Sequence, residues 1–147
     1  MVGKGRRQGS VLARARPIGN RAGFAAKMRR GGSGAGAVAT IEDFEALDIR
    51  VGTVRDARPL PEARKPSICL WIDFGGALGV RQSSAQITVH YRPDTLIGRQ
   101  VMAVVNFPPR RIAGFTSEVL TLGVPDTDGA VVLLRPDFTV PDGGRMF

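Results

Sequence analysis

Short runs of apolar residues, separated by glycine, proline and polar residues, recur from residue 48 to residue 134. Within one of these runs, Ile68, Leu70 and Ile72 fall on one face of an extended chain, which is the alternation expected of a β-strand. The runs that predict strands lie at residues 49–54, 67–74, 79–87, 100–107, 117–124 and 130–134. Short strands at near-regular spacing predict a closed or sandwiched all-β architecture.

Two short helices are predicted beside the strands. The residues TIED (40–43) have the pattern of a capping box, in which the Thr40 hydroxyl satisfies a free backbone N–H and an acid follows three residues later. The residues YRPDTL (91–96) predict a helical turn between the third and fourth strands. The first helix would run to about residue 47 with an apolar stripe formed by Ile41, Phe44 and Leu47.

The net charge of +8 comes from the N-terminal segment of the chain. Residues 1–37 hold nine Lys or Arg and no acid, whereas residues 38–147 hold 12 basic and 13 acidic residues, a net of −1. The stretch GGSGAGA (31–37) has the composition of a flexible linker. We therefore predict a disordered basic tail over 1–37 and one domain over 38–147. The tail is compatible with a basic arm that contacts phosphates, a transit peptide, or a start assigned too far upstream.

No arrangement of residues in the sequence indicates catalysis. It has no Walker A motif, no dinucleotide-binding glycine pattern and no G-x-S-x-G elbow. The single histidine, His90, and the single cysteine, Cys69, cannot form a zinc site or an internal disulfide. We expect a non-enzymatic protein without metal or cofactor. The lone cysteine favours a reducing compartment, the cytoplasm, and the absence of 18 consecutive apolar residues argues against membrane insertion.

Two polar segments are candidates for a binding surface. The first, RQSSAQ (81–86), offers hydroxyls and amides on a strand, which suit contacts to phosphates or base edges but equally suit a solvated edge strand. The second, NFPPRRIAGFTSE (106–118), places Arg110 and Arg111 in a loop stiffened by two prolines, between Phe107 and Phe115. Its aromatic residues could instead belong to the core, with the arginines only improving solubility.

Several long motifs occur in an order that resembles the CsaA-type proteins. They are DFEALDIRVGTV (43–54), LWIDFG (70–75), RQSSAQIT (81–88), AVVNFPPRRIAGFTSEVLTLG (103–123) and VVLLRPD (131–137). This family is similar to the tRNA-binding domains fused to some methionyl- and phenylalanyl-tRNA synthetases, and the resemblance covers residues 40–147. It implies an OB-fold barrel of about five main strands, a homodimer and tRNA binding. For the CsaA branch it also implies binding of unfolded or pre-export polypeptides.

The second polar segment also resembles a pattern of the tRNA-binding group, N-L-K-P-x-K-M-R-G-x-x-S. The residues that fit this pattern are Asn106, Pro109, Arg111, Gly114 and Ser117. Pro108 and Ala113 stand where the group usually has basic residues. Because each lost phosphate contact weakens binding and flattens its salt dependence, the resemblance implies a lower tRNA affinity than that of the synthetase-fused domains.

The leading interpretation is recognition of tRNA through its shape and backbone. Arg110 and Arg111 would hold phosphates, and Asn106 would order the loop or contact a base. The further RNA-binding residues expected along one trough are Arg50, Lys65, Arg81, Ser83, Ser84, Gln86 and Ser117. The alternative is a chaperone that binds polypeptides through an apolar groove near Phe107, Ile112 and Phe115. A homodimer would cover apolar residues at both ends of the domain, namely Phe44, Leu47, Phe138 and Val140.

Overall fold

The computed structural model of this 147-residue chain describes residues 37–147, and Val38–Phe147 forms one compact unit. The segment predicted to be a disordered tail, residues 1–37, lies outside the described residues except for Ala37. Along the described part of the chain, no helix is both long enough and apolar enough to cross a membrane.

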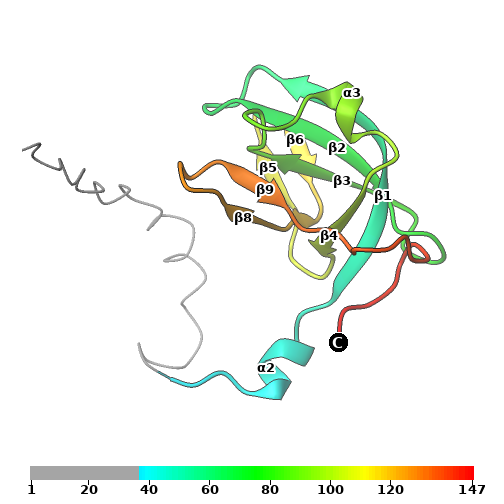
Figure 1. Ribbon diagram of the computed structural model, residues 1–147. Helices are drawn as coiled ribbons and strands as arrows, with labels where there is room; N and C mark the ends of the chain where they lie inside the picture. The colour runs from blue at the N-terminus through cyan, green and yellow to red at the C-terminus, as the bar shows by residue number, and fades with distance from the viewer. Residues whose placement is uncertain (1–36) are drawn as a thin grey trace, which may run out of the picture. The chain divides into compact units, whose positions relative to one another are not determined.

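The first described element, α2 (Ile41–Glu45), begins at the predicted capping box. The backbone N–H of Asp43 donates to the Thr40 hydroxyl over 3.3 Å, and the Thr40 N–H donates to the Asp43 carboxylate over 2.8 Å. These bonds satisfy donors that the first turn leaves unpaired. The helix ends two residues earlier than predicted, and it stands clear of the sheet with no buried residue (Figure 1).

The main sheet has five antiparallel strands in the order β3-β2-β1-β4-β7. Its strands are β1 (Ile49–Leu60), β2 (Ser67–Asp73), β3 (Val80–Ala85), β4 (Gln100–Val104) and β7 (Leu120–Thr121). The helical turn α3 (Pro93–Leu96) connects β3 to β4, as predicted. Two separate hairpins pair β5 (Arg110–Ile112) with β6 (Phe115–Ser117) and β8 (Gly123–Pro125) with β9 (Val131–Leu133) (Figure 1).

Two predicted strands differ from the observed ones. The strand β1 continues to Leu60, six residues beyond the predicted end at residue 54. A bulge between Val54 and Asp56 shifts the alternation of inward and outward residues, and the prediction relied on this alternation. The predicted strand 117–124 is instead divided among β6, β7 and β8. The chain leaves β6 at Glu118, whose N–H donates to the Gln82 carbonyl of β3 over 2.8 Å.

The core fills the inside of the curled sheet. Leu70, Ile72 and Val101 are completely buried there, and Leu96 of α3 closes one end. Gly52 of β1 faces the same interior, where a Cβ atom would lie 2.6 Å from Ile72 Cγ2 and would clash with it. A side chain at this position would therefore push β2 away from β1.

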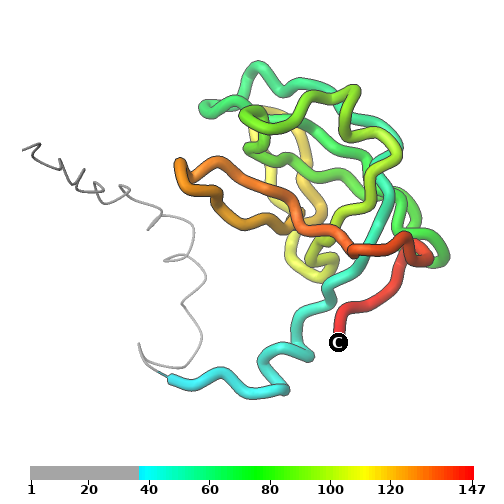
Figure 2. The backbone as a smooth tube through the Cα atoms, in the orientation of Figure 1, coloured from blue at the N-terminus to red at the C-terminus, as the bar shows by residue number. Residues whose placement is uncertain are grey.

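Side-chain hydrogen bonds join the two end strands of the sheet. Ser83 of β3 is completely buried, and its hydroxyl donates to the Val119 carbonyl over 3.2 Å. The Thr121 hydroxyl of β7 donates to Ser83 Oγ over 2.8 Å. Because β3 and β7 are the outermost strands, these bonds curl the sheet toward a barrel. The tube in Figure 2 follows this curled path, which confirms the predicted OB-like all-β fold.

We expect Ser83→Ala to destabilise the protein by about 1–3 kcal/mol, because it removes one of the two hydroxyls that donate to the Val119 carbonyl and leaves the Thr121 hydroxyl without its acceptor. Ser84→Ala is the matched control, since Ser84 is only half-buried and bonds Ser117 through its backbone N–H. Urea unfolding followed by circular dichroism measures both changes. Equal stability of the two variants would contradict this role for Ser83.

Candidate nucleic-acid interface

The fold brings the two polar segments of the sequence side by side. The backbone N–H of Ser84 in β3 donates to the Ser117 hydroxyl in β6 over 3.1 Å. One step along, the Gln82 N–H donates to the Glu118 carboxylate over 2.8 Å. The strand β6 therefore continues the surface of the sheet beyond the free edge of β3. Hydroxyls from segment 81–86 and cations from the hairpin lie on adjoining strands.

The β5–β6 hairpin, residues 110–117, presents its two arginines at the protein surface. Arg110 lies opposite Ser117 and Arg111 lies opposite Thr116, and both arginines are exposed. Successive residues of a strand point to opposite faces. Arg110 therefore shares a face with Phe115, whereas Arg111 points to the other side of the hairpin. The hairpin therefore presents one cation on each of its two faces.

A tight turn holds the hairpin. Ala113 and Gly114 both have positive φ values, 49° and 82°, as expected of the two central residues of a type I′ turn. This conformation is unfavourable for alanine, which has a Cβ atom, and costs on the order of 1 kcal/mol. Any other residue with a Cβ atom would meet the same strain at position 113, whereas glycine would not.

Trp71 and Arg58 are the surface residues that the sequence analysis missed. The Arg58 guanidinium lies over the Trp71 ring, with its central carbon 5.2 Å from the ring centroid. Phe115 of the hairpin meets the same ring edge-on, with centroids 5.7 Å apart at 80°. Trp71 was hidden in a run interpreted as core, although it is out of phase with the inward Leu70 and Ile72. Arg58 lies in the part of β1 beyond the predicted strand end.

The position of Ser83 corrects the prediction that its hydroxyl binds RNA. Ser83 is completely buried and bonded within the barrel, so its hydroxyl cannot reach a ligand. Its two neighbours in β3, Gln82 and Ser84, are half-buried, and Ser84 was also among the predicted residues. The hydroxyl that the sequence pattern assigned to the binding surface instead holds the sheet closed.

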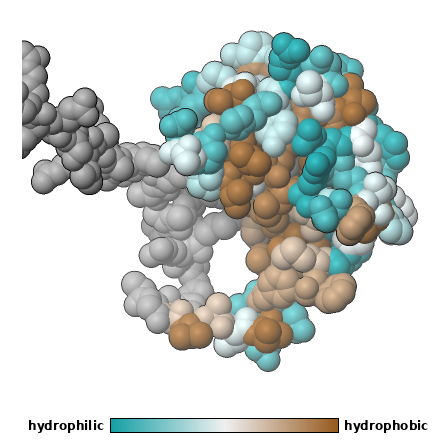
Figure 3. All heavy atoms as spheres, viewed as in Figure 1, coloured by the Kyte–Doolittle hydropathy of each residue, from teal (hydrophilic) through white to brown (hydrophobic). Residues whose placement is uncertain are grey.

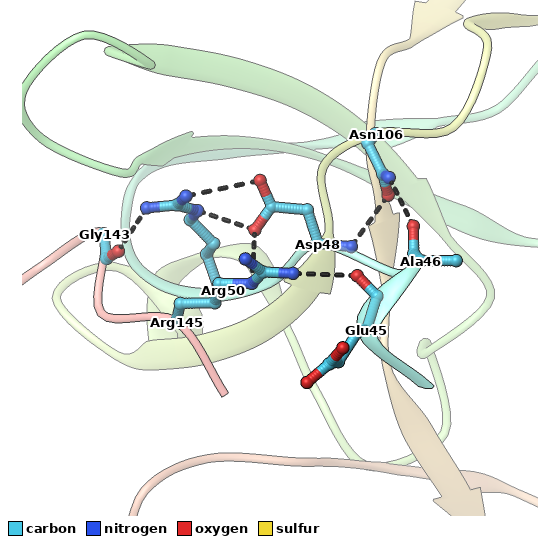
Figure 4. Close-up of polar contacts among 7 residues, drawn as sticks. All are labelled: Glu45, Ala46, Asp48, Arg50, Asn106, Gly143 and Arg145. Atoms are coloured by element: carbon cyan, nitrogen blue, oxygen red, sulfur yellow. Dashed lines mark hydrogen bonds and ion pairs between the residues drawn. The ribbon is translucent and has the colours of Figure 1, made fainter. Parts of the chain in front are cut away.

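Two predicted cations are engaged by the fold itself. Arg50 donates to both oxygens of Asp48, over 2.7 and 3.3 Å, and to the Gly143 carbonyl over 3.0 Å (Figure 4). These contacts place Arg50 beside the C-terminal segment rather than beside the hairpin. Arg81 donates to the Leu78 carbonyl over 3.0 Å and lies 3.6 Å from the Glu118 carboxylate.

Asn106 orders the chain that leads into the hairpin. Its side-chain oxygen accepts from the Asp48 N–H over 2.9 Å, and its side-chain nitrogen donates to the Ala46 carbonyl over 2.8 Å (Figure 4). Arg145 donates in turn to the Glu45 carbonyl over 2.9 Å. These bonds attach the end of α2 to the sheet, so the geometry favours the ordering role among the two considered for Asn106.

The remaining predicted residues lie at the ends of strands. Lys65 is exposed in the loop between β1 and β2, and Gln86 is exposed directly after β3. In OB folds the face of the second and third strands and the loops around it bind oligonucleotides.

The three residues considered for peptide binding, Phe107, Ile112 and Phe115, are half-buried.

The surroundings of two ionisable groups, Cys69 and Asp126, shift their pKa values. Burial, with Glu62 nearby, raises the pKa of the Cys69 thiol. His90 Nε2 lies 2.6 Å from Asp126, and the hydrogen bond to His90 is the main cause that lowers the pKa of Asp126. Asp126 also accepts from the Asp128 and Ala130 N–H groups in the β8–β9 turn. Residues 37–147 contain no group of three His, Cys, Asp or Glu side chains placed to hold a metal ion.

Residues 49–145 match the family model described as "Putative tRNA binding domain". The chain belongs to this tRNA-binding domain family. Among solved structures it is similar to the CsaA chaperone of Bacillus anthracis, with 57% identity and a TM-score of 0.70 over 76% of this chain and all of that one. The CsaA chaperone of Picrophilus torridus is 47% identical, with a TM-score of 0.70 over 75% of this chain and all of that one.

The chain is also similar to part of an enzyme. It is 40% identical to the methionine–tRNA ligase of Porphyromonas gingivalis over 105 residues, which are 71% of this chain and 15% of the ligase. It thus spans about one seventh of the length of that relative. This chain is therefore similar both to the whole of two CsaA chaperone structures and to a small part of a methionine–tRNA ligase.

Proposed function

We propose that this protein is a non-enzymatic tRNA-binding protein that recognises RNA by shape and backbone. The observation that carries the proposal is the joining of β3 to β6, which places the hairpin arginines beside the β2–β3 face in a member of the tRNA-binding domain family. The catalytic activity of the methionine–tRNA ligases is not part of the proposal, because the similarity spans only 15% of such an enzyme. We place the protein in the cytoplasm, where Cys69 would stay reduced.

Local charge rather than total charge supports this surface. The sequence from residue 38 onward has a net charge of −1, so cations must be concentrated to attract phosphates. The nearby carboxylates already have partners, since Glu118 accepts from the Gln82 N–H and Asp56 pairs with Arg58 at 2.8 Å. Arg111 forms no ion pair within residues 37–147. Its guanidinium is therefore available to a phosphate group.

A chaperone function is the second candidate, and the 57% identity to a CsaA chaperone favours it. Its groove would include Phe107, Ile112 and Phe115, which lie on or next to the β5–β6 hairpin. Because the same hairpin carries the arginines proposed to hold RNA, a polypeptide and a tRNA would compete for this protein.

We further propose a homodimer that covers an apolar surface away from the hairpin. This apolar C-terminal face comprises the exposed residues Val124, Val132, Leu134, Phe138, Val140 and Met146. Apolar side chains gather on the side of the molecule that carries β8 and β9 (Figure 3). A groove of about 210 Å³ between this segment and the sheet is lined by Val51, Met102 and Val140. A second copy would remove this surface from water, which a monomer leaves exposed.

We expect Arg110→Ala combined with Arg111→Ala to weaken tRNA binding at least tenfold, about 1.4 kcal/mol. The slope of log affinity against log salt should also fall by about one to two, because two phosphate contacts are lost. A gel-shift titration at several salt concentrations measures both. Arg92→Ala with Arg135→Ala removes the same charge from other exposed positions and should leave the slope unchanged. Equal effects of the two double variants would contradict the proposed surface.

The chaperone candidate predicts that the protein suppresses aggregation of an unfolded client and that added tRNA relieves this suppression. Light scattering of a chemically unfolded client, diluted into buffer with and without the protein, measures the effect. Unchanged aggregation at a tenfold excess of the protein would exclude this second function. Suppression that tRNA does not alter would place the two ligands on different surfaces.

The dimer predicts that Phe138→Asp combined with Val140→Asp halves the mass measured by light scattering after gel filtration. Phe138 is 80% exposed and Val140 is 37% exposed in the single chain, so neither side chain belongs to the buried core. Val89→Asp, at a 76% exposed position after β3, is the control and should keep the dimer mass. A wild-type mass of one chain at all concentrations would refute the dimer.

A further inference from the structure

Trp71 occupies an unusual position for the only tryptophan of the chain. Its neighbours in β2, Leu70 and Ile72, are completely buried in the core, whereas Trp71 points to the opposite face and is half-buried. A large aromatic ring on the outer face of a sheet remains partly in water unless something covers it. Its surroundings indicate what could do so.

Three contacts hold the indole in one orientation. With the Gln82 amide turned so that its oxygen accepts from the indole N–H over 3.2 Å, the amide nitrogen donates to the Thr116 carbonyl over 3.1 Å. Phe115 packs edge-on against the ring, 5.7 Å between centroids. The third contact is the Arg58 guanidinium over the ring at 5.2 Å. The site therefore joins β1, β2, β3 and the hairpin.

Arg58 is fixed over the indole rather than free to follow a phosphate. Its Nε and Nη2 atoms donate to one oxygen of Asp56, over 3.1 and 2.8 Å. The side chain of Arg58 is nevertheless 69% exposed. One side of the planar guanidinium thus contacts Trp71, and the side chain as a whole remains open to water. Because Asp56 balances its charge, this arginine offers a flat surface more than a net positive charge.

We infer that the Arg58–Trp71 pair is a stacking site for one unpaired base of a bound RNA. Nucleobases stack on guanidinium planes as they do on aromatic rings, without regard to their sequence. Phosphates on either side of such a base would find cations on both flanks, Arg110 on the hairpin face that carries Phe115 and Lys65 in the loop between β1 and β2. The inference rests on the proposed RNA-binding function and adds to it the kind of nucleotide that is read.

The surroundings of the pair favour a base over an apolar peptide side chain. Beside the apolar Cys69 and Phe115, the neighbouring outward positions are polar, namely Asp56, Gln82 and Ser84. An apolar side chain would therefore cover the ring and leave these groups without new partners, whereas a base offers both a flat face and polar edges. The chemistry of the site thus matches a planar, polar-edged ligand.

The single tryptophan makes the site directly observable. We expect the fluorescence of the full chain, excited beyond the absorption of tyrosine, to be quenched by single-stranded RNA of mixed sequence. The quenching should saturate with the same Kd that a gel shift gives for the same RNA. A blunt duplex of the same sequence offers no unpaired base and should leave the fluorescence unchanged, even where it produces a gel shift.

Variants separate stacking from charge. Arg58→Lys keeps the charge and loses the planar guanidinium, so it should weaken binding of labelled single-stranded RNA about fivefold, measured by anisotropy. Trp71→Ala should weaken it about tenfold, whereas Trp71→Phe should remain within threefold of the wild type because it keeps an aromatic face. Arg92→Lys is the matched control, an exposed arginine likewise paired with an aspartate two residues away, and should have no effect.

The outcomes distinguish the inference from the function on which it rests. RNA that shifts in the gel without quenching Trp71, together with an unaffected Arg58→Lys, would overturn the stacking site and leave RNA binding intact. Quenching by an unfolded polypeptide but not by single-stranded RNA would assign the site to peptides and overturn the inference. No gel shift with any RNA would overturn the proposed function and the stacking site together. Circular dichroism spectra of all variants should match the wild type, and Trp71→Phe provides the comparison if Trp71→Ala unfolds.

Discussion

The buried hydroxyl of Ser83 is the contact on which the arrangement of this protein depends. Ser83 lies on the last strand at one end of the sheet, and its partners, the Val119 carbonyl and the Thr121 hydroxyl, lie at the other end. The β5–β6 hairpin lies in the connection between β4 and β7, directly before Val119. The same contacts that curl the sheet therefore set the hairpin against β3. The contacts that close the sheet therefore also assemble the candidate binding surface.

Several arginines of this domain lie in different structural surroundings. Arg50, Arg81 and Arg145 donate to carbonyls and carboxylates that connect the termini and the turns. The C-terminal segment consequently returns beside the start of β1, as Figure 2 shows and the Met146–Ile49 backbone hydrogen bond requires. Arg110 and Arg111 are exposed on a short hairpin at another part of the surface. In a domain whose charges nearly cancel, this difference decides where an anion is attracted.

This chain is similar both to CsaA chaperones and to part of a methionine–tRNA ligase, and a fold alone does not define a ligand. The surface of this chain differs in detail from the pattern of the tRNA-binding group. Pro108 and Ala113 lack the usual charges, while the Arg58–Trp71 pair adds a flat, ordered surface beside the hairpin. Fewer basic residues would make fewer phosphate contacts, whose affinity depends on salt. A base-stacking contact would provide affinity that does not depend on salt.

Local signals in the amino-acid sequence were sufficient to predict several elements of the fold. The capping box at Thr40, the alternation in β2, the helical turn before β4 and the two polar segments were all visible in it, because hydrogen-bonding and apolar periodicity act over a few residues. The resemblance of the sequence motifs to a known family extended the prediction from single elements to the OB-like barrel. The all-β fold was thus predictable without coordinates.

The face of the sheet on which each polar side chain lies could not be predicted from such local signals. A bulge at Val54 and Asp56 displaced the alternation of β1 and brought Arg58 over Trp71. Ser83, which was predicted to bind RNA, points into the core. Arg50 bonds Asp48, two positions away, and Gly143, 93 positions away along the chain. Strand alternation specifies two faces but not which one is buried, because the choice depends on partners far away along the chain.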